Sequence, residues 1–427
     1  MKITVIGAGV VGLCTAFELA ERGAEVTVVD AGAAGRGASA GNAGWITPFL
    51  STPRAAPGVV GDAARNLLRP GGPARIHPHP TASFLSWTAG FLRASRPGPN
   101  QHATKALQRL AATAVGAVDA LAERGVAFEH HRDGLAVVAL TDATLTAYQL
   151  LHSRMTDYGY TGTACLVRGR DVREFDPAIR EGVAGVLHLV DERHVRPESL
   201  GAGLVAALQV RGVVVKERSA VSRIRASVTG GTAREWVVTL ADGAEIVSGA
   251  VVVAAAYSSR SLLRSLGVDL PMEVARGTSL TAVGEGTAPR HPLKLAEHMV
   301  ACSPFDSAVR LSGTFDLGAR STRLSRRRLD AVISGGLRYL HDWRPTTVES
   351  QWVGHRPTSP DDLPVIGAVP GHPGLFVNTG HGTLGITLGP TSGALLADEI
   401  ISSRCQDLLA PFRITRFHQA KQPKLVK

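Results

Sequence analysis

Cysteine is scarce in this chain of 427 residues. The four cysteines, at positions 14, 165, 302 and 405, lie far apart and form no CxxC pair. A disulfide framework or a structural zinc site needs several cysteines at short, regular spacings. We therefore expect neither of them, and we expect no metal site.

Long hydrophobic runs are missing as well. A helix that crosses a bilayer needs about 20 consecutive apolar residues. The longest apolar run here, residues 246–256, is rich in valine and alanine and fits a strand buried inside a parallel sheet. We expect a cytoplasmic protein.

Aromatic residues make up only 5% of the chain, although its net charge is +10. The basic residues are spread along the sequence, apart from Arg326–Arg328 and three lysines near the end (Lys421, Lys424, Lys427). No aromatic residues are interleaved with them and no nucleic-acid-binding motif is present. We expect no nucleic-acid partner; peripheral contact with the inner membrane face and a merely solvated basic surface both stay open.

Glycine, in contrast, is abundant, and the first thirty residues use it in a recognisable order. Residues 2–6 predict a buried strand, residues 13–22 a helix and residues 25–29 a second strand that ends in Asp30. Three glycines of the GxGxxG type, Gly7, Gly9 and Gly12, stand between the first strand and the helix. They permit a tight turn, the approach of a pyrophosphate to the backbone and close helix–strand packing. This unit predicts a site for an adenine dinucleotide, with Asp30 accepting hydrogen bonds from ribose.

A second glycine-rich turn lies near the other end of the chain. Gly380, Gly382 and Gly385 precede a predicted helix that runs from about Pro390 to Ile401. A helix N-terminus stabilises partial negative charge, such as that on a reduced flavin ring. An acid at Asp30 disfavours the 2′-phosphate of NADP, and the second turn favours FAD over NAD.

The order of the predicted elements indicates an α/β protein with two interleaved domains. Parallel-type apolar segments, among them residues 213–215 and 221–224, alternate with helices such as 104–124 and 197–210. Residues 51–80 are rich in Pro, Gly and Arg and look irregular, and residues 271–347 favour antiparallel strands. We assign 1–85, 190–265 and 348–427 to a dinucleotide-binding domain, and 86–189 and 266–347 to an α+β substrate-binding domain built on a mixed sheet.

Taken together, these motifs resemble the D-amino-acid oxidase superfamily of FAD-dependent oxidoreductases. The resemblance rests on the N-terminal fingerprint, Asn42–Gly44, Gly354–Pro357 with Asp361, and Gly380–Gly385, and it runs over essentially the whole chain. Within the superfamily, the bacterial D-amino-acid and D-hydroxyproline dehydrogenases are most similar. The resemblance implies a glutathione-reductase-like FAD domain and oxidation of the C–N bond of an amino acid or amine by hydride transfer to flavin N5, which gives an imine.

The resemblance also implies which residues bind the cofactor, and it implies non-covalent FAD because Cys302 lacks the surroundings of a flavin-linked cysteine. Relatives of the sarcosine oxidase type carry a lysine where Leu384 stands here, which favours a dehydrogenase over an oxidase. The implied FAD-binding residues are Gly7, Gly9, Val10, Val11, Gly12, Asp30, Ala31, Ser39, Asn42, Ala43, Gly44, Val221, Gly354, Gly380, His381, Gly382, Thr383, Leu384 and Gly385.

Catalysis by hydride transfer requires a substrate that is held with its carboxylate clamped and its amine neutral. A guanidinium can bind a carboxylate through two parallel hydrogen bonds. Arg356 and Arg310 are the candidates, although either could be structural. Tyr257 could cover the substrate, and His381 could tune the flavin or relay a proton.

Three alternatives stay open at this point: an NAD-linked dehydrogenase, an FAD oxidase or tailoring enzyme that acts on a biosynthetic amine, and a non-catalytic flavin-binding protein. The electron acceptor could be a quinone, an electron-transfer protein or O2. The sequence leaves the oligomeric state and the side chain of the substrate undetermined.

Overall fold

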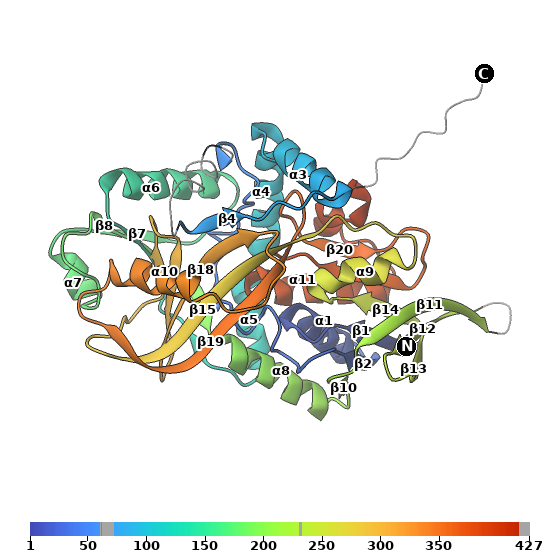
Figure 1. Ribbon diagram of the computed structural model, residues 1–427. Coiled ribbons are helices and arrows are strands. Elements are labelled where there is room, and N and C mark those ends of the chain that lie inside the picture. Colours follow the sequence, from blue (N-terminus) through green and yellow to red (C-terminus); the bar gives the residue numbers. More distant parts are fainter. Residues whose placement is uncertain (60, 62–71, 230–232, 418–427) are drawn as a thin grey trace, which may run out of the picture.

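The computed structural model describes residues 1–59, 61, 72–229 and 233–417 (Figure 1). The three terminal lysines and most of the proline-rich stretch after residue 59 lie outside these residues. The described chain forms two large sheets that stand beside each other, with helices packed around both (Figure 1).

The first sheet has six strands in the order β10-β2-β1-β14-β21-β20. All neighbours are parallel except β20 and β21. Of the two central strands, β14 is apolar and completely buried and β1 is buried from Ile3 to Ile6, as expected for a parallel sheet that is covered on both faces. The strands are β1 (Lys2–Ile6), β2 (Glu25–Val29), β10 (Val214–Lys216), β14 (Ala250–Val253), β20 (Val365–Ala368) and β21 (Leu375–Thr379).

Helices cover one face of this sheet and share one hydrophobic core with it. They are α1 (Val10–Glu21), α4 (Pro97–Ala111), α5 (Ala114–Glu123), α8 (Pro197–Val210) and α11 (Gly385–Ser402). The opposite face packs against α9 and a three-stranded antiparallel sheet. These elements are α9 (Ser259–Arg264), β11 (Val221–Thr229), β12 (Ala233–Leu240) and β13 (Glu245–Ser248).

The second sheet has nine strands and is mixed. Its order is β19-β15-β18-β17-β16-β6-β8-β7, and β4 pairs in parallel with β18. β16 and β6 are also parallel, whereas the other neighbours are antiparallel. The strands are β4 (Ala74–Ile76), β6 (Leu135–Ala139), β7 (Ala164–Val167), β8 (Gly185–Leu189), β15 (Glu273–Glu285), β16 (Leu293–Leu295), β17 (Val300–Pro304), β18 (Val309–Leu317) and β19 (Arg344–Thr358).

Smaller elements connect and cover the two sheets. A three-stranded sheet joins β3 (Trp45–Ile46), β5 (His130–His131) and β9 (Arg193–Val195). The remaining helices are α3 (Ala82–Ala94), α6 (Asp142–Asp157), α7 (Asp171–Phe175) and α10 (Arg326–Leu337), with short 3-10 turns at Ala256–Ser258, Asp407–Phe412 and Ile414–Phe417. In the described residues, no helix is both long and apolar enough to span a bilayer.

The predicted α/β class is confirmed, but three local predictions are wrong. The helix expected at 104–124 is two helices, α4 and α5, because Thr113 leaves the helical conformation. Residues 221–224 pair antiparallel with β12, since the hairpin that follows folds back on them. The last long helix begins at Gly385, so Pro390 lies inside it and not in its first turn.

The domain boundaries remain a proposal, and the sheets suggest where they need adjustment. The predicted boundary between 347 and 348 falls within β19, which pairs with β15 along its whole length. β4 comes from the first predicted segment, yet it joins the nine-stranded sheet. We propose that β4 and β19 belong to the substrate domain.

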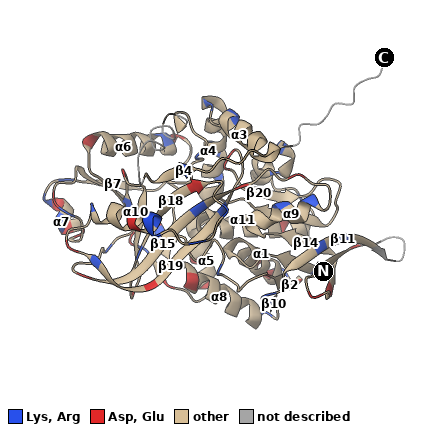
Figure 2. Ribbon diagram, in the orientation of Figure 1, with Lys and Arg blue, Asp and Glu red and all other residues tan. Residues whose placement is uncertain are grey.

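Basic and acidic residues are interspersed along the ribbon in Figure 2. Many of them form ion pairs, such as Arg22 with Glu18 and Asp398, and Arg124 with Glu18. Arg326–Arg328 begin α10, where Arg328 is buried against Asp316. At least part of this basic run therefore stabilises the fold.

Candidate active site

A cavity of about 470 Å³ lies at the carboxyl ends of β1, β14 and β21 in the first sheet. We call it the dinucleotide cavity. This edge of a parallel sheet is where nucleotides bind in open α/β folds. Thirteen predicted cofactor-binding residues line it: Gly7, Gly9, Val10, Val11, Asp30, Ala31, Ser39, Asn42, Val221, Gly380, His381, Gly382 and Gly385.

Two glycines of the fingerprint shape the turn between β1 and α1. Gly7 has φ +111°, and a Cβ on it would lie 2.4 Å from the carbonyl oxygen of Ala254. A Cβ on Gly12 would lie only 1.8 Å from the carbonyl oxygen of Gly7. Gly12 does not line the cavity, but it lets α1 start directly above β1. The structure thus confirms the expected steric roles of both residues.

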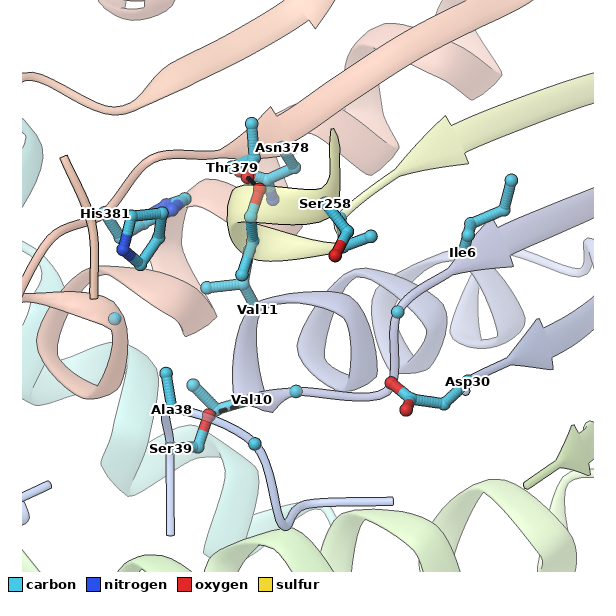
Figure 3. Close-up of a pocket in the computed structure, with 18 of the residues that line it drawn as sticks. Ile6, Val10, Val11, Asp30, Ala38, Ser39, Ser258, Asn378, Thr379 and His381 are labelled. Atoms are coloured by element: carbon cyan, nitrogen blue, oxygen red, sulfur yellow. Dashed lines mark hydrogen bonds between the residues drawn. The ribbon is translucent and has the colours of Figure 1, made fainter. Parts of the chain in front are cut away.

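Polar groups are arranged along the middle of the dinucleotide cavity (Figure 3). The first N–H of α1, on Val10, donates to Ser39 Oγ at 3.0 Å. The carboxylate of Asp30 accepts from Ala8 N and Gly32 N, both at 2.7 Å. Each carboxylate oxygen still has capacity for a further donor, so Asp30 can accept from ribose hydroxyls.

The end of the dinucleotide cavity that lies opposite Asp30 is formed by the segment from Asn378 to Ile386. Figure 3 shows His381 on the far side of Val11 from Asp30. Burial lowers the pKa of His381 to about 3, and its Nε2 lies 3.1 Å from Ser392 Oγ. A histidine that stays neutral and is bound to a buried hydroxyl supports the turn and is a poor proton donor at neutral pH. Gly385, the first residue of α11, adds a second helix N-terminus to the cavity.

A second cavity, of about 250 Å³, adjoins the first and shares Asn42 with it. We call it the cationic cavity because three basic side chains, Arg54, Lys294 and Arg356, line it. Its other walls come from the nine-stranded sheet, from residues 42–52 and from the turn before α11. Ala43, Thr383 and Leu384, which were predicted to bind the cofactor, lie here.

Arg356, the first candidate for a carboxylate clamp, lines the cationic cavity. Its Nη1 donates to the carbonyl oxygen of Thr314 at 2.9 Å. A Cβ on Gly277 would lie 2.2 Å from its Nη2, so this glycine makes room for the guanidinium. Burial, followed by the charge of Arg54, lowers the pKa of Arg356 to about 10. It remains cationic at neutral pH.

Arg310 does not fit the predicted role. Its side chain donates to Thr281 Oγ1, to the carbonyl oxygens of Ala40 and Asn42, and to Glu198. It lines neither cavity. With every nitrogen engaged, the guanidinium has no free edge for a carboxylate, so Arg310 is structural.

Three further predicted residues lie outside both cavities. Tyr257 packs against the hydrophobic cluster under the first sheet and does not cover a substrate site. Gly354 and Gly41 leave space for the indole of Trp352, which a Cβ at either position would strike. Gly44 has φ +82°, and its N–H donates to Asn42 Oδ1 at 2.8 Å. Gly354 and Gly44 therefore serve packing and loop geometry.

Sequence reasoning missed Arg54 and Lys294. Arg54 belongs to a stretch that seemed merely irregular. Lys294 did leave a signal, since a lysine between two leucines interrupts a buried apolar strand. Neither Cys302 nor any other cysteine lines either cavity. Glu129, His131 and Asp306 are near one another but lie outside both cavities, and Glu129 Oε1 already accepts hydrogen bonds from the other two residues.

Comparisons with known proteins agree with this geometry. The family model described as FAD dependent oxidoreductase (DAO) matches residues 2–399. The chain is 31% identical over 421 residues to a D-amino acid dehydrogenase from Xylella fastidiosa strain M12, covering 95% of this chain and 93% of the relative. It is 31% identical over 446 residues to one from Methylobacterium sp. strain 4-46, covering 98% and 100%.

Solved structures share the fold at lower identity. Glycine oxidase from Geobacillus kaustophilus superposes with a TM-score of 0.73 at 22% identity, covering 97% of this chain and 98% of that one. L-Proline dehydrogenase from P. horikoshii gives 0.73 at 16% identity, covering 98% and 97%. The glycine cradle, Asp30 and the two helix N-termini fit FAD, so the NAD alternative is set aside.

Proposed function

This chain belongs to the FAD-dependent oxidoreductase (DAO) family and is an FAD-dependent enzyme that acts on amino acids or amines, and from this premise we propose that it oxidises the C–N bond of a D-amino acid or a related amine to an imine. The bound FAD supplies the acceptor, at N5, for the hydride that leaves the α-carbon. The observation that carries the proposal is the position of Arg356, in a small cavity beside the dinucleotide cavity.

The chain's own residues bind and orient the substrate. Arg356 offers a guanidinium edge to the α-carboxylate, while Thr314 holds the other side of that guanidinium. Asn42 lines both cavities, and its Nδ2 donates to the carbonyl oxygen of Thr383 at 3.1 Å. This bond ties the loop after β2 to the turn before α11, at the place where the two cavities meet.

The charge of the cavity also favours the reactive form of the substrate. Hydride transfer requires a neutral amine, because a protonated one lacks the lone pair that stabilises the product. Cations nearby lower the pKa of a substrate ammonium. Among the described residues that line the cationic cavity there is no carboxylate and no histidine, so no anion there stabilises the ammonium form.

The experiment is an anaerobic screen of D- and L-amino acids and their decarboxylated amines against the purified holoenzyme, with flavin bleaching as the readout. Reduction by D-amino acids supports the proposal. Reduction by L-amino acids alone overturns it, and equally efficient reduction by decarboxylated amines and their parent acids overturns the role of Arg356 as a carboxylate clamp.

We also propose non-covalent FAD and a dehydrogenase that uses a quinone or an electron-transfer protein as acceptor. Release of the flavin on denaturation tests the first. The preference for a dehydrogenase rests on Leu384, which stands where relatives of the sarcosine oxidase type carry a lysine. Leu384 lines the same cavity as Lys294, however, so this cavity does contain a lysine. Peroxide formation in air decides between the two acceptor classes: stoichiometric peroxide identifies an oxidase.

A further inference from the structure

We infer, building on the proposed function, that the cationic cavity selects amino acids with a second anionic group. Arg356 binds the α-carboxylate, and Arg54 and Lys294 bind the anion on the substrate side chain. The preferred substrate class is thus a small acidic amino acid.

The first observation is that none of the three cations forms an ion pair with a described residue; the guanidinium of Arg356 donates only to the carbonyl oxygen of Thr314. In the part of the chain that the structure describes, no hydrogen bond or ion pair is formed by the guanidinium of Arg54 or the ammonium of Lys294. The guanidinium of Arg54 lies over the ring of Phe315, with Cζ 4.5 Å from its centroid. Its backbone N–H, and not its side chain, donates to Asp362 Oδ2 at 2.7 Å.

Other interior arginines among the described residues do form ion pairs. Arg310 pairs with Glu198, and Arg328 and Arg276 both pair with Asp316. Because an unpaired buried charge costs several kcal/mol, folds normally supply such partners. Arg54, Lys294 and Arg356 are exceptions among the described residues, and all three line the same cavity.

The second observation is mutual repulsion among the three groups. Burial, followed by the charge of Arg54, lowers the pKa of Lys294 to about 8. Arg54 also lowers the pKa of Arg356. Burial lowers the pKa of Arg54, and the charge of Asp362 opposes this effect. Asp362 does not line the cavity; burial raises its pKa, and the charge of Arg54 opposes that rise. Among the described residues that line the cavity, one α-carboxylate would therefore face three cations and no anion.

The position of Lys294 is set by the register of β16. Leu293 and Leu295 are buried on one side of this strand, so the residue between them must point to the other side. There it meets Arg54, Phe315 and Leu384 across the cavity. At about 250 Å³ the cavity is smaller than most drug-binding pockets, which suits a compact dianion.

The test compares isosteric substrates that differ only in charge: glutamate with glutamine, and aspartate with asparagine, in both enantiomers. Anaerobic stopped-flow measurement gives the limiting rate of flavin reduction and the substrate Kd. We expect the acid of each pair to be favoured by about tenfold or more, mainly in Kd. Equal efficiency of acid and amide, or a preference for alanine, overturns the inference while the proposed function stands.

Variants of the cavity test whether the preference for the acid over the amide comes from the cationic cavity. Lys294→Met should reduce the acid-to-amide ratio of kcat/KM by about tenfold. Lys105→Met is the matched control, since Lys105 is exposed on α4 and lines neither cavity. Arg54→Gln serves as the second variant if Lys294→Met loses its flavin. An unchanged ratio in whichever variant retains its flavin overturns the inference.

A binding measurement covers the case in which no amino acid reduces the flavin, which would refute the proposed function. Glutarate and its monoamide are then titrated against the flavin spectrum of the holoenzyme. Tighter binding of glutarate, lost in Lys294→Met, supports a dianion site independently of turnover. Equal binding of the two compounds overturns it.

Discussion

Arg310 and Arg356 are both arginines of the nine-stranded sheet, but Arg310 is buried and Arg356 is half-buried, and their surroundings give them different tasks. Arg310 has four partners and no access to a cavity, whereas Arg356 has one hydrogen-bonded carbonyl and an edge that faces the cationic cavity. The same side chain therefore stabilises the fold in one place and is free to bind a ligand in the other.

Arg356→Lys should weaken the oxidation of amino acids but not that of the corresponding decarboxylated amines. A lysine keeps the charge but cannot bind a carboxylate with two parallel bonds. The expected loss is about 1–3 kcal/mol, or roughly tenfold to a hundredfold in kcat/KM. Steady-state kinetics on matched acid and amine pairs measure it, and equal losses for both would show that Arg356 does not read the carboxylate.

Arg310→Lys should lower stability and leave the ratio of acid to amine unchanged. Lysine cannot reach all four partners, so carbonyl groups and Glu198 lose hydrogen bonds inside the protein. We expect a loss of about 1–3 kcal/mol in the free energy of unfolding. Denaturant titration gives the stability. A changed ratio of acid to amine oxidation at normal stability would show that Arg310 does bind the substrate.

Asp30→Ala should yield a folded protein with little FAD. The variant loses up to two charge-assisted hydrogen bonds to ribose, each worth about 1.5–3 kcal/mol. It also frees Ala8 N and Gly32 N, which now donate to the carboxylate. Asp30→Asn keeps one acceptor oxygen and should retain more flavin. Full flavin content and unchanged FAD affinity in Asp30→Ala would mean that this βαβ unit does not bind the ribose.

The role of a single residue can be predicted from the sequence when the pattern that marks it lies within a short stretch of the chain. Gly7, Gly12 and Asp30 act within one short βαβ unit, so their spacing alone reveals their roles. Arg54 and Lys294 come together only when residues some 240 positions apart fold onto the same cavity, and no local pattern marks that meeting. Tyr257 was misassigned because an aromatic residue beside a buried strand can face either side of it.

Helices α1 and α11 pack closely against each other beside the dinucleotide cavity. A Cβ on Gly393 of α11 would lie 2.9 Å from Thr15 N of α1. The two helices thus approach backbone to backbone, and both of their N-termini line the dinucleotide cavity. Their close packing fixes the distance between the two ends of the cofactor site.

Gly12→Ala should disturb this arrangement. The new methyl group would overlap the carbonyl oxygen of Gly7, and α1 would have to move away from β1. Overpacking of this kind costs about 1–3 kcal/mol, and flavin affinity should fall with it. Gly116→Ala in α5 is the control, because its Cβ meets no atom within 4 Å. It should raise stability by about 0.5–1 kcal/mol. A Gly12→Ala protein with normal Tm and flavin content would refute the steric argument.

At the level of elements, apolar periodicity located most helices and strands, but partners and breaks depended on tertiary contacts. No glycine or proline stands at Thr113, so the sequence does not predict that the helix breaks there. The hydroxyl of Thr113 lies 3.3 Å from the hydroxyl of Thr391 on α11, which is a tertiary contact. Likewise, residues 221–224 alternate as a strand does, but only the returning hairpin makes them antiparallel.

Across the whole molecule, segments distant in sequence are joined by buried polar groups such as Glu192. Its carboxylate accepts from Phe49 N at 3.2 Å and from Tyr160 Oη at 2.9 Å. Burial raises the pKa of Glu192 to about 7. In the unfolded chain this group loses its proton near its ordinary pKa, whereas in the folded protein it keeps the proton to higher pH.

Stability should therefore fall as pH rises from about 4.5 to about 7, because the folded state binds the extra proton in that window. This contribution is on the order of 3 kcal/mol. Glu192→Gln should flatten the pH dependence of unfolding by denaturant in this range. Glu123→Gln, at an exposed position on α5, should not. Parallel pH profiles for Glu192→Gln and the unaltered protein would contradict the assignment.

The dinucleotide cavity takes one wall from residues 6–42 and another from residues 378–386, with β14 between them in the sheet. The ribosome synthesises residues 6–42 before residues 378–386, and nascent chains fold from the N-terminus as they emerge. The growing chain thus exposes the βαβ unit long before the turn at Gly380 exists to close the site. FAD capture is consequently a late event in biosynthesis, and a chain arrested before residue 378 would lack the wall that completes its cofactor site.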